Sequence, residues 1–388
     1  MKRIFKYIVV FFVWTLSLVR RIIRGRRRIS LSGSRCLIIS VSGIGNAVMA
    51  TPLIQALKVS CGAAVIDVLT SGASHATLFR GIRFCNSIYL YPKTGWDRLK
   101  LVHSIRRNKY DLLLLAFPTP EIHYTLLVLA VNAYMVISHD YGIYHPFFRF
   151  LKYVADHIIS VNKNLHDIEQ NANLVHNLTD HTFIFKSYPP FIISDLAVEQ
   201  AQHFYRDKNI GMAETVCFIH PGSKRGTDYK RWPLDRFIAL GHKLKDEHNL
   251  IVIVILGPDE EEHRNLFEQH GFITTLFSFS TTLAILQRGS MLISNDSGMM
   301  HVASMMRVPT VTIWGGTDMR RNGARGNKAL NIVNDSVRCR PCVRFAPDIH
   351  CPAVQFECIQ SISVDQVYQG MLQNGFLSIK QNAGKRKI

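Results

Sequence analysis

The chain has 388 residues, of which 47% are hydrophobic and 19% charged, a balance that suits a two-domain globular protein and excludes a disordered or fibrous one. The formal net charge is +18. Residues 1–28 hold nine Lys and Arg residues and no acid, so half of that charge lies at the N-terminus. No helix-turn-helix, zinc-finger or RNA-binding motif accompanies it. The charge therefore indicates an anionic membrane surface as partner and no nucleic acid.

The first expected element is an apolar run from Tyr7 to Val19, flanked by cations on both sides. As a helix it would reach about 20 Å, short of the ~30 Å hydrocarbon core. No small-residue cleavage site follows it. The pattern predicts that residues 1–28 are an uncleaved anchor that lies in or dips into the bilayer, with a short single-pass signal anchor as the alternative. The Arg-rich side, and the body after it, would face the cytoplasm at the inner membrane.

Apolar runs and helical patterns then alternate. Expected strands cover 36–41, 64–69, 88–91, 111–117 and 134–138, and a helix covers 46–59. After a linker at 187–190, expected strands cover 216–220, 250–256, 290–294 and 310–314, with a helix over 233–247. Continuous apolar strands that alternate with helices predict parallel sheets covered on both faces. We expect two Rossmann-like α/β domains, 29–190 and 191–380, that face each other across a cleft.

Several candidate binding segments directly follow these strands, where ligands sit in such sheets. A glycine turn that includes Gly45 and Asn46 follows the first strand, and a simple strand-to-helix turn explains it equally well. A basic, hydroxyl-bearing loop with Ser223 and Lys230 opens the second half and suits a diphosphate, although a solvated basic loop has the same composition.

Two further segments combine a strand end with a helix start. Asp296, Ser297 and Gly298 offer a helix N-terminus to phosphate oxygens, with His301 about one turn on. The alternative is an ordinary N-cap followed by a structural histidine. Glu260 follows another strand, where a carboxylate suits ribose hydroxyls or simply complements the helix dipole.

In this order and spacing the motifs resemble glycosyltransferase family 9, the lipopolysaccharide heptosyltransferases. The resemblance covers roughly residues 35 to 370. It includes the glycine turn followed by Thr51-Pro52-Leu53, a His-x-x-x-x-Asn from His166 to Asn171, Lys-x-Trp-Pro at 230–233, and Asp-Ser-Gly-x-x-His at 296–301.

The resemblance implies a GT-B fold and inverting transfer of a sugar, heptose from ADP-heptose, to a lipid-linked saccharide acceptor of lipopolysaccharide-core type. No cofactor or metal would act at the nucleotide. The nucleotide-sugar would be held by the second domain, with Lys230 as the clamp on the leaving phosphate. By position, Lys230, Asp296, Ser297, Gly298 and His301 would hold the diphosphate, and Glu260 would contact the ribose. Gly45 of the glycine turn and Ser223 of the basic loop are the further expected nucleotide-sugar contacts.

One position departs from the family pattern. The family generally has Asp after the glycine turn as the presumed general base, and this chain has Asn46, whose amide does not accept a proton near pH 7. The rival interpretation is a non-catalytic relic that binds a nucleotide-sugar or a lipid carrier. An epimerase on the same fold is a third interpretation, for which no second acid-base group is evident.

Four of the eight cysteines cluster as Cys339-x2-Cys342-x8-Cys351-x6-Cys358. The spacing fits structural zinc, and it also fits reduced thiols or disulfides.

Overall fold

The computed structural model describes residues 15, 18–19, 30–117, 122–140, 154–162, 164–176, 178, 183–224, 226–326, 328–342, 351 and 356–378. The predicted anchor at 1–28 lies outside them apart from three isolated residues. In the described part of the chain, no helix has the length and apolarity needed to span a membrane. The chain divides into two compact units, residues 1–192 and 193–388.

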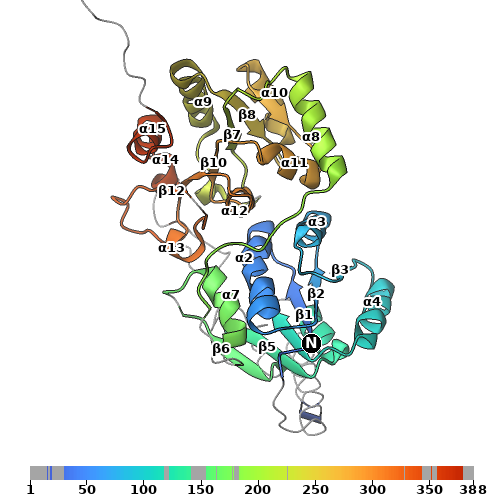
Figure 1. The fold of residues 1–388 in the computed structure, drawn as a ribbon. Coiled ribbons are helices and arrows are strands. Elements are labelled where there is room, and N and C mark those ends of the chain that lie inside the picture. Colours follow the sequence, from blue (N-terminus) through green and yellow to red (C-terminus); the bar gives the residue numbers. More distant parts are fainter. Residues whose placement is uncertain are drawn as a thin grey trace, which may run out of the picture. The chain divides into compact units, whose positions relative to one another are not determined.

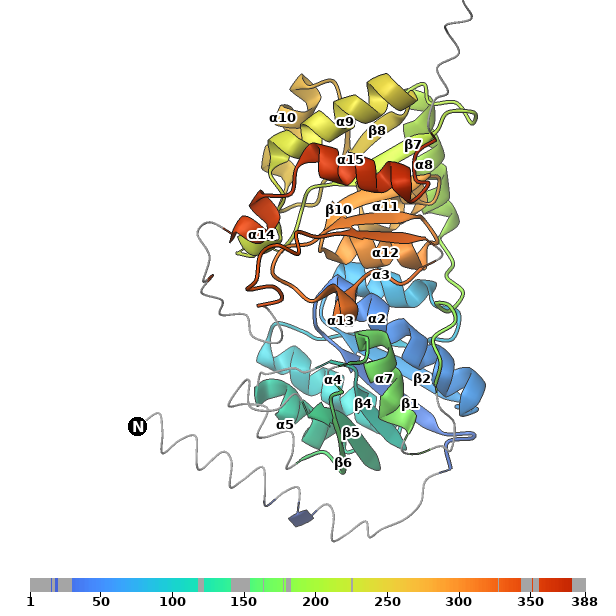
Figure 2. The same ribbon diagram turned by 90° about the vertical axis from the view of Figure 1, so that its left-hand side faces the viewer.

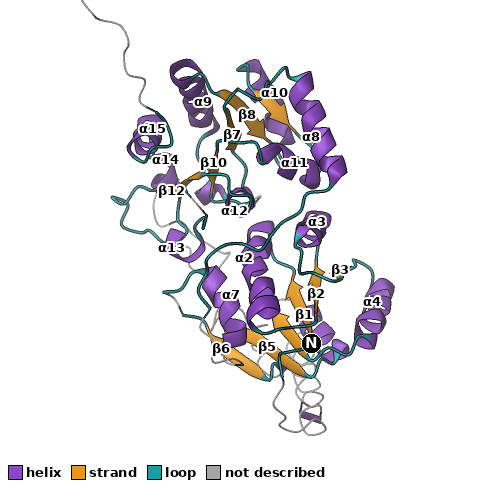
Figure 3. Cartoon of the chain, viewed as in Figure 1, coloured by secondary structure: helices purple, strands orange, loops and turns teal. Residues whose placement is uncertain are grey.

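The N-terminal unit contains a six-stranded parallel sheet in the order β3-β2-β1-β4-β5-β6 (Figures 1 and 3). Its strands are β1 Arg35–Ser40, β2 Val65–Thr70, β3 Ile88–Leu90, β4 Leu112–Leu115, β5 Met135–Asp140 and β6 His157–Ser160. The central strands are buried on both faces, as their continuous apolar runs predicted. This strand order is that of a doubly wound Rossmann sheet, which reverses direction between β1 and β4.

Helices cover both faces of this sheet. They are α2 Ile44–Gln55, continued by a π-helical turn Ala56–Ser60, α3 Ala73–Gly81, α4 Gly95–Arg107, α5 Ile122–Val131 and α7 Asp167–His176. Figure 2 shows α2 and α7 together on one face, and α4 and α5 on the other. The segment before the second unit is held against α3, because Ile192 N donates to Gly81 O at 2.8 Å.

The C-terminal unit repeats the same order, β12-β11-β10-β7-β8-β9, again with all pairs parallel. Its strands are β7 Val216–His220, β8 Ile251–Ile255, β9 Ile273–Thr275, β10 Met291–Asn295, β11 Thr310–Ile313 and β12 Ala329–Ile332. Here the direction reverses between β7 and β10, which are hydrogen-bonded neighbours. Two of the predicted binding segments therefore leave adjacent strands at the point where a crevice opens in such sheets.

The helices of this unit are α8 Asp195–Asp207, α9 Leu234–His248, α10 Arg264–Gln269, α11 Phe279–Leu286, α12 Gly298–Met305, α13 Met319–Asn322, α14 Glu357–Gln360 and α15 Val364–Gln373. Short 3-10 helices cover Asp228–Lys230 and Glu261–His263. A core formed with α9, α10 and α15 includes the buried Trp232, Phe237 and Phe267. Trp232 anchors the Lys-x-Trp-Pro segment, because its indole Nε1 donates to Ile362 O at 2.8 Å.

Candidate active site

The predicted clamp lysine is held in a buried ion pair. Lys230 Nζ lies 2.7 Å from Asp296 Oδ2, and the two side chains are 20% and 4% exposed. Thr317 Oγ1, from the loop after β11, donates to the same carboxylate oxygen at 2.7 Å. The 3-10 helix Asp228–Lys230 thus brings the cation to the N-terminal end of α12, next to the strand-order reversal. Lys230 keeps an exposed part with which to meet an anion.

Unsatisfied polar atoms surround this pair. Within the described residues, the buried atoms Ser297 Oγ and His301 Nδ1 have no hydrogen-bond partner. Burial lowers the pKa of His301 to about 4; Asp296 opposes the shift and Lys230 adds to it. The imidazole is therefore neutral at pH 7. Buried polar atoms normally have partners, so these atoms and the free N–H groups at the start of α12 suit the oxygens of a bound anion.

Asn295, to which the sequence assigns no role, links three segments of the site. Its Oδ1 accepts from Trp232 N at 2.9 Å, and its Nδ2 donates to Pro221 O at 2.6 Å. Asn295 is fully buried. A single amide thereby holds the loop after β7, the Lys-x-Trp-Pro segment and the end of β10 in one register. Its place directly before Asp296 was the only signal in the sequence.

The loop after β7 packs tightly against Glu260. A Cβ on Gly222 would lie 2.5 Å from the Glu260 carboxyl and 2.8 Å from His220 Cε1, so a side chain there would force one of these two side chains to move. Glu260 is buried, and its Oε2 accepts from Gly257 N at 3.0 Å. Burial lowers the pKa of His220, although the Glu260 charge opposes this. The predicted ribose carboxylate thus lies at the carboxyl end of β8 and supports the neighbouring loop.

Ser223 is buried and accepts two hydrogen bonds from Arg231. Arg231 Nε donates to Ser223 Oγ at 3.1 Å, and a second guanidinium nitrogen donates to Ser223 O at 2.9 Å. In this structure the predicted Ser223 hydroxyl therefore fixes the loop, and Arg231 is the unpredicted residue that holds it.

Gly315, after β11, lies against the turn that carries Lys230. A Cβ there would lie 1.8 Å from Tyr229 O. Arg340 Nε donates to Gly315 O at 2.6 Å. Because the backbones of Gly315 and Tyr229 approach so closely, they fix the position of the 3-10 helix relative to the end of β11, and with it the position of the Lys230 ammonium.

In the N-terminal unit, Gly45 and Asn46 lie in the first turn of α2, at that sheet's own reversal point, and both are half-buried. His75 of α3 contacts the same turn: its Nε2 lies 2.7 Å from Ser42 O, so it donates there and leaves Nδ1 as the acceptor. Burial lowers the pKa of His75, so the ring favours its neutral form. Of the His-x-x-x-x-Asn motif, Asn171 joins α7 to α2 by donating to Met49 O at 3.2 Å.

Cys339, Cys342, Cys351 and Cys358 are free thiols. Burial raises the pKa of Cys358 to about 11, which favours the neutral thiol over the thiolate that metals bind. Across the described stretches, no three His, Cys, Asp or Glu side chains form a metal-binding group. Structural zinc at these cysteines stays a prediction.

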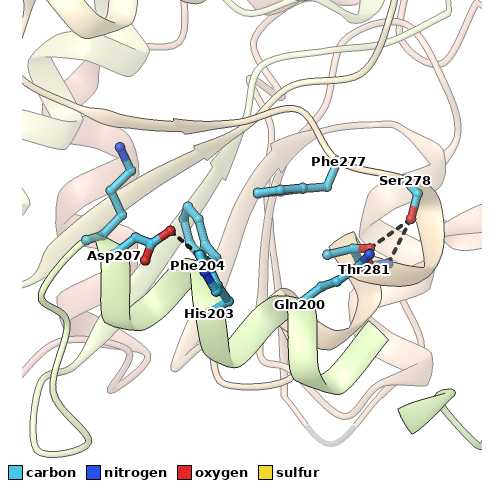
Figure 4. Close-up of a pocket in the computed structure, with 8 residues that line it drawn as sticks. Gln200, His203, Phe204, Asp207, Phe277, Ser278 and Thr281 are labelled. Atoms are coloured by element: carbon cyan, nitrogen blue, oxygen red, sulfur yellow. Dashed lines mark hydrogen bonds and ion pairs between the residues drawn. The ribbon is translucent and has the colours of Figure 1, made fainter. Parts of the chain in front are cut away.

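A hollow of about 430 Å³ in the C-terminal unit contains none of the motif residues. Figure 4 shows it between α8 and α11, where the Phe204 and Phe277 rings meet edge-on at 5.5 Å. His203 and Asp207 form an exposed pair beside it, at 2.7 Å. Phe277 and Ser278 follow the edge strand β9, so this hollow does not lie at the reversal between β7 and β10 from which the motif loops leave.

Solved structures with the same fold include a family 9 glycosyltransferase from Veillonella parvula, with a TM-score of 0.72 and 19% identity over 89% of this chain and 97% of that one. The ADP-heptose lipopolysaccharide heptosyltransferase II of Escherichia coli matches with a TM-score of 0.67 and 18% identity, over 88% of this chain and 98% of that one. Both chains share the fold of this one, and the prediction of two parallel-sheet α/β domains with GT-B architecture is confirmed.

Among curated proteins, lipooligosaccharide heptosyltransferase 2 of Campylobacter jejuni is 25% identical over 173 residues, 42% of this chain and 52% of that protein. This chain thus spans about half the length of the first curated relatives it matches. Lipopolysaccharide heptosyltransferase 3 of Escherichia coli is 24% identical over 71% of this chain and 81% of its own. The family model for glycosyltransferase family 9 (heptosyltransferase) matches residues 98–349, well over half of the chain. The chain belongs to glycosyltransferase family 9.

Proposed function

We propose that this protein transfers heptose from ADP-heptose, with inversion, to a lipid-linked saccharide of lipopolysaccharide-core type at the cytoplasmic face of the inner membrane. The observation that carries the proposal is the Lys230–Asp296 pair at the N-terminal end of α12, beside the reversal of the C-terminal sheet. Doubly wound sheets bind nucleotides at such reversals.

The diphosphate would lie against the start of α12. There the Ser297 hydroxyl and neighbouring backbone N–H groups would donate to its oxygens, and Lys230 would turn partly from Asp296 toward the leaving phosphate. Charge builds on that phosphate as the sugar bond breaks, so a preorganised cation stabilises the transition state more than the ground state. His301 is neutral and suits a hydrogen bond to the diphosphate.

The acceptor hydroxyl must lose a proton, and Asn46 does not accept one. His75 is our candidate for the missing base. Its ring contacts the turn before Asn46, and because Nε2 donates to Ser42 O, Nδ1 is the nitrogen that accepts a proton. Asn46 would then orient the acceptor through its amide. Residues 1–28 would hold the protein near its lipid-linked substrate.

Thermal stability of the full chain, measured with ADP, other nucleoside diphosphates and their sugar conjugates, tests the donor. A ligand at 100 times its dissociation constant stabilises by about 2.7 kcal/mol, a readable shift. We expect selective stabilisation by ADP and ADP-sugars, and release of ADP once a lipopolysaccharide-core acceptor is added. Preference for another base would discard ADP-heptose. Nucleotide binding with no turnover on any acceptor would favour the non-catalytic relic.

A further inference from the structure

Helix α4 of the N-terminal unit has an exposed face whose residues do not contribute to the core of the unit. The helix packs on the core through Ile105, with Leu101 and Val102 partly buried beside it. On the opposite side Trp96 is 78% exposed and Leu99 62% exposed. At 3.6 residues per turn, one face carries Trp96, Leu99, Lys100, His103, Arg106 and Arg107. We call these six residues the α4 outer face.

The charge around this face is strongly basic. Lys93, Lys100, Arg106, Arg107 and Lys109 are all exposed. The one acid of the helix is already engaged, because Asp97 accepts from Thr94 Oγ1 at 2.6 Å and lies 3.7 Å from Lys100 Nζ. Cations in the last turn complement the helix dipole, which accounts for Arg106 and Arg107. The dipole does not account for the exposed Trp96 and Leu99 among the first five residues of the helix.

The turn that presents Trp96 is firmly built. Arg98 Nε donates to Pro92 O at 3.0 Å, a second guanidinium nitrogen donates to Lys93 O at 3.1 Å, and the guanidinium lies over the Tyr91 ring at 5.0 Å. Leu90, at the end of the edge strand β3, is 43% exposed just before this turn. The apolar side chains are thus displayed by an ordered corner of the unit, where Figure 1 shows α4 beside β3.

Tryptophan and leucine beside a row of cations match the interface of an anionic bilayer, where the rings enter the headgroup level and the cations meet lipid phosphates. We propose that the α4 outer face is a second membrane-contact surface, which lies on anionic lipid together with the basic, apolar segment 1–28. This inference rests on the membrane location in the proposed function and deepens it. The run from Tyr7 to Val19 is short, and stable attachment generally needs two membrane-binding signals.

Tryptophan fluorescence tests the surface in the full chain. The chain has four tryptophans, and Trp232 and Trp314 are fully buried. In a Trp14→Phe variant, Trp96 is therefore the exposed tryptophan among the described residues. With vesicles of phosphatidylcholine and phosphatidylglycerol we expect a blue shift of this emission and its quenching by brominated lipid, and little of either with phosphatidylcholine alone. A Trp14→Phe/Trp96→Phe variant is the matched control and should show no change. Trp96 emission that stays unquenched while the protein sediments with the vesicles overturns the proposal.

Vesicle affinity gives the second measurement. Each cation near an anionic surface contributes about fivefold, or about 1 kcal/mol, so Lys100→Gln/Arg106→Gln/Arg107→Gln should weaken binding by about 100-fold. Trp96→Ser/Leu99→Ser should weaken it as well, and Lys208→Glu and Met212→Ser, both exposed on the other unit, should not.

Other occupants of the surface have their own signatures. A blue shift that appears without lipid and grows with protein concentration would identify a second copy of the chain, and a shift caused by RNA but not by vesicles would identify nucleic acid. Either result overturns the proposal. ADP stabilisation should be unchanged in all these variants. If ADP failed to stabilise the wild type, the proposed donor would fail while the quenching result still decided the membrane surface.

Discussion

Replacing Lys230 by Met should damage both stability and catalysis, for separable reasons. The substitution keeps most of the aliphatic volume but leaves the Asp296 carboxylate, 4% exposed, with Thr317 as its remaining partner. Removing one member of a buried ion pair costs about 3–5 kcal/mol. Because Lys230 is itself 20% exposed, we expect the lower end, about 3 kcal/mol. For a unit of this size that corresponds to a Tm lower by roughly 6–12 °C.

A double variant separates the two effects. Lys230→Met/Asp296→Asn also removes the unpaired charge, so it should recover most of the lost Tm. It should still lack the cation at the leaving phosphate, and turnover should stay lower by about 10²–10³-fold, the usual cost of one transition-state donor. The measurements are calorimetry of all variants and release of ADP from the sugar nucleotide with acceptor present.

The matched control is Lys243→Met on α9, whose partners Glu247 and Asp365 are 48% and 80% exposed. We expect it to change stability by less than about 1 kcal/mol and to leave turnover intact. If Lys230→Met melted with the wild type and the double variant melted lower, the buried-pair argument would be refuted. Wild-type turnover in Lys230→Met would refute the phosphate clamp.

Three further predictions concern other parts of the two units. Gly315→Ala places a Cβ against Tyr229 O, so it should move the Lys230 turn and lower turnover by about 10²-fold, whereas Gly211→Ala meets only a flexible side chain and should not; steady-state kinetics of both decide this. Burial lowers the pKa of His301 from 6.5 to about 4, so as the pH falls the unfolded chain takes up this proton before the folded chain does. The free energy of unfolding should therefore be constant above pH 6.5 and fall by about 3 kcal/mol toward pH 4. Thermal melts across this pH range should show a smaller fall for His301→Gln. His75→Gln should abolish the rise of turnover with pH, and Asn46→Asp should restore activity to it; activity of His75→Gln equal to the wild type at every pH would exclude His75 as the base.

Much of the fold could be predicted from the chain because its central strands are apolar on both faces. The strand expected at 216–220 is β7 without change, and the other central strands differ from the prediction by a few residues. Three strands were missed: β6, β9 and β12. All three are short and partly exposed at sheet edges, so they lack the apolar run by which a buried strand is identified.

The candidate site was likewise predicted only in part from the sequence. Sequence alone determined which loops leave the strand ends and which polar residues they carry, because motif spacing and strand alternation are local properties. Only the tertiary structure decided that Lys230 is paired with Asp296, that Arg231 donates to Ser223, and that the Asn295 amide is hydrogen-bonded to both neighbouring loops. These contacts join residues far apart in the chain, across strands whose adjacency depends on the crossover order. That order is set by packing the whole sheet against its helices, and no local pattern encodes it.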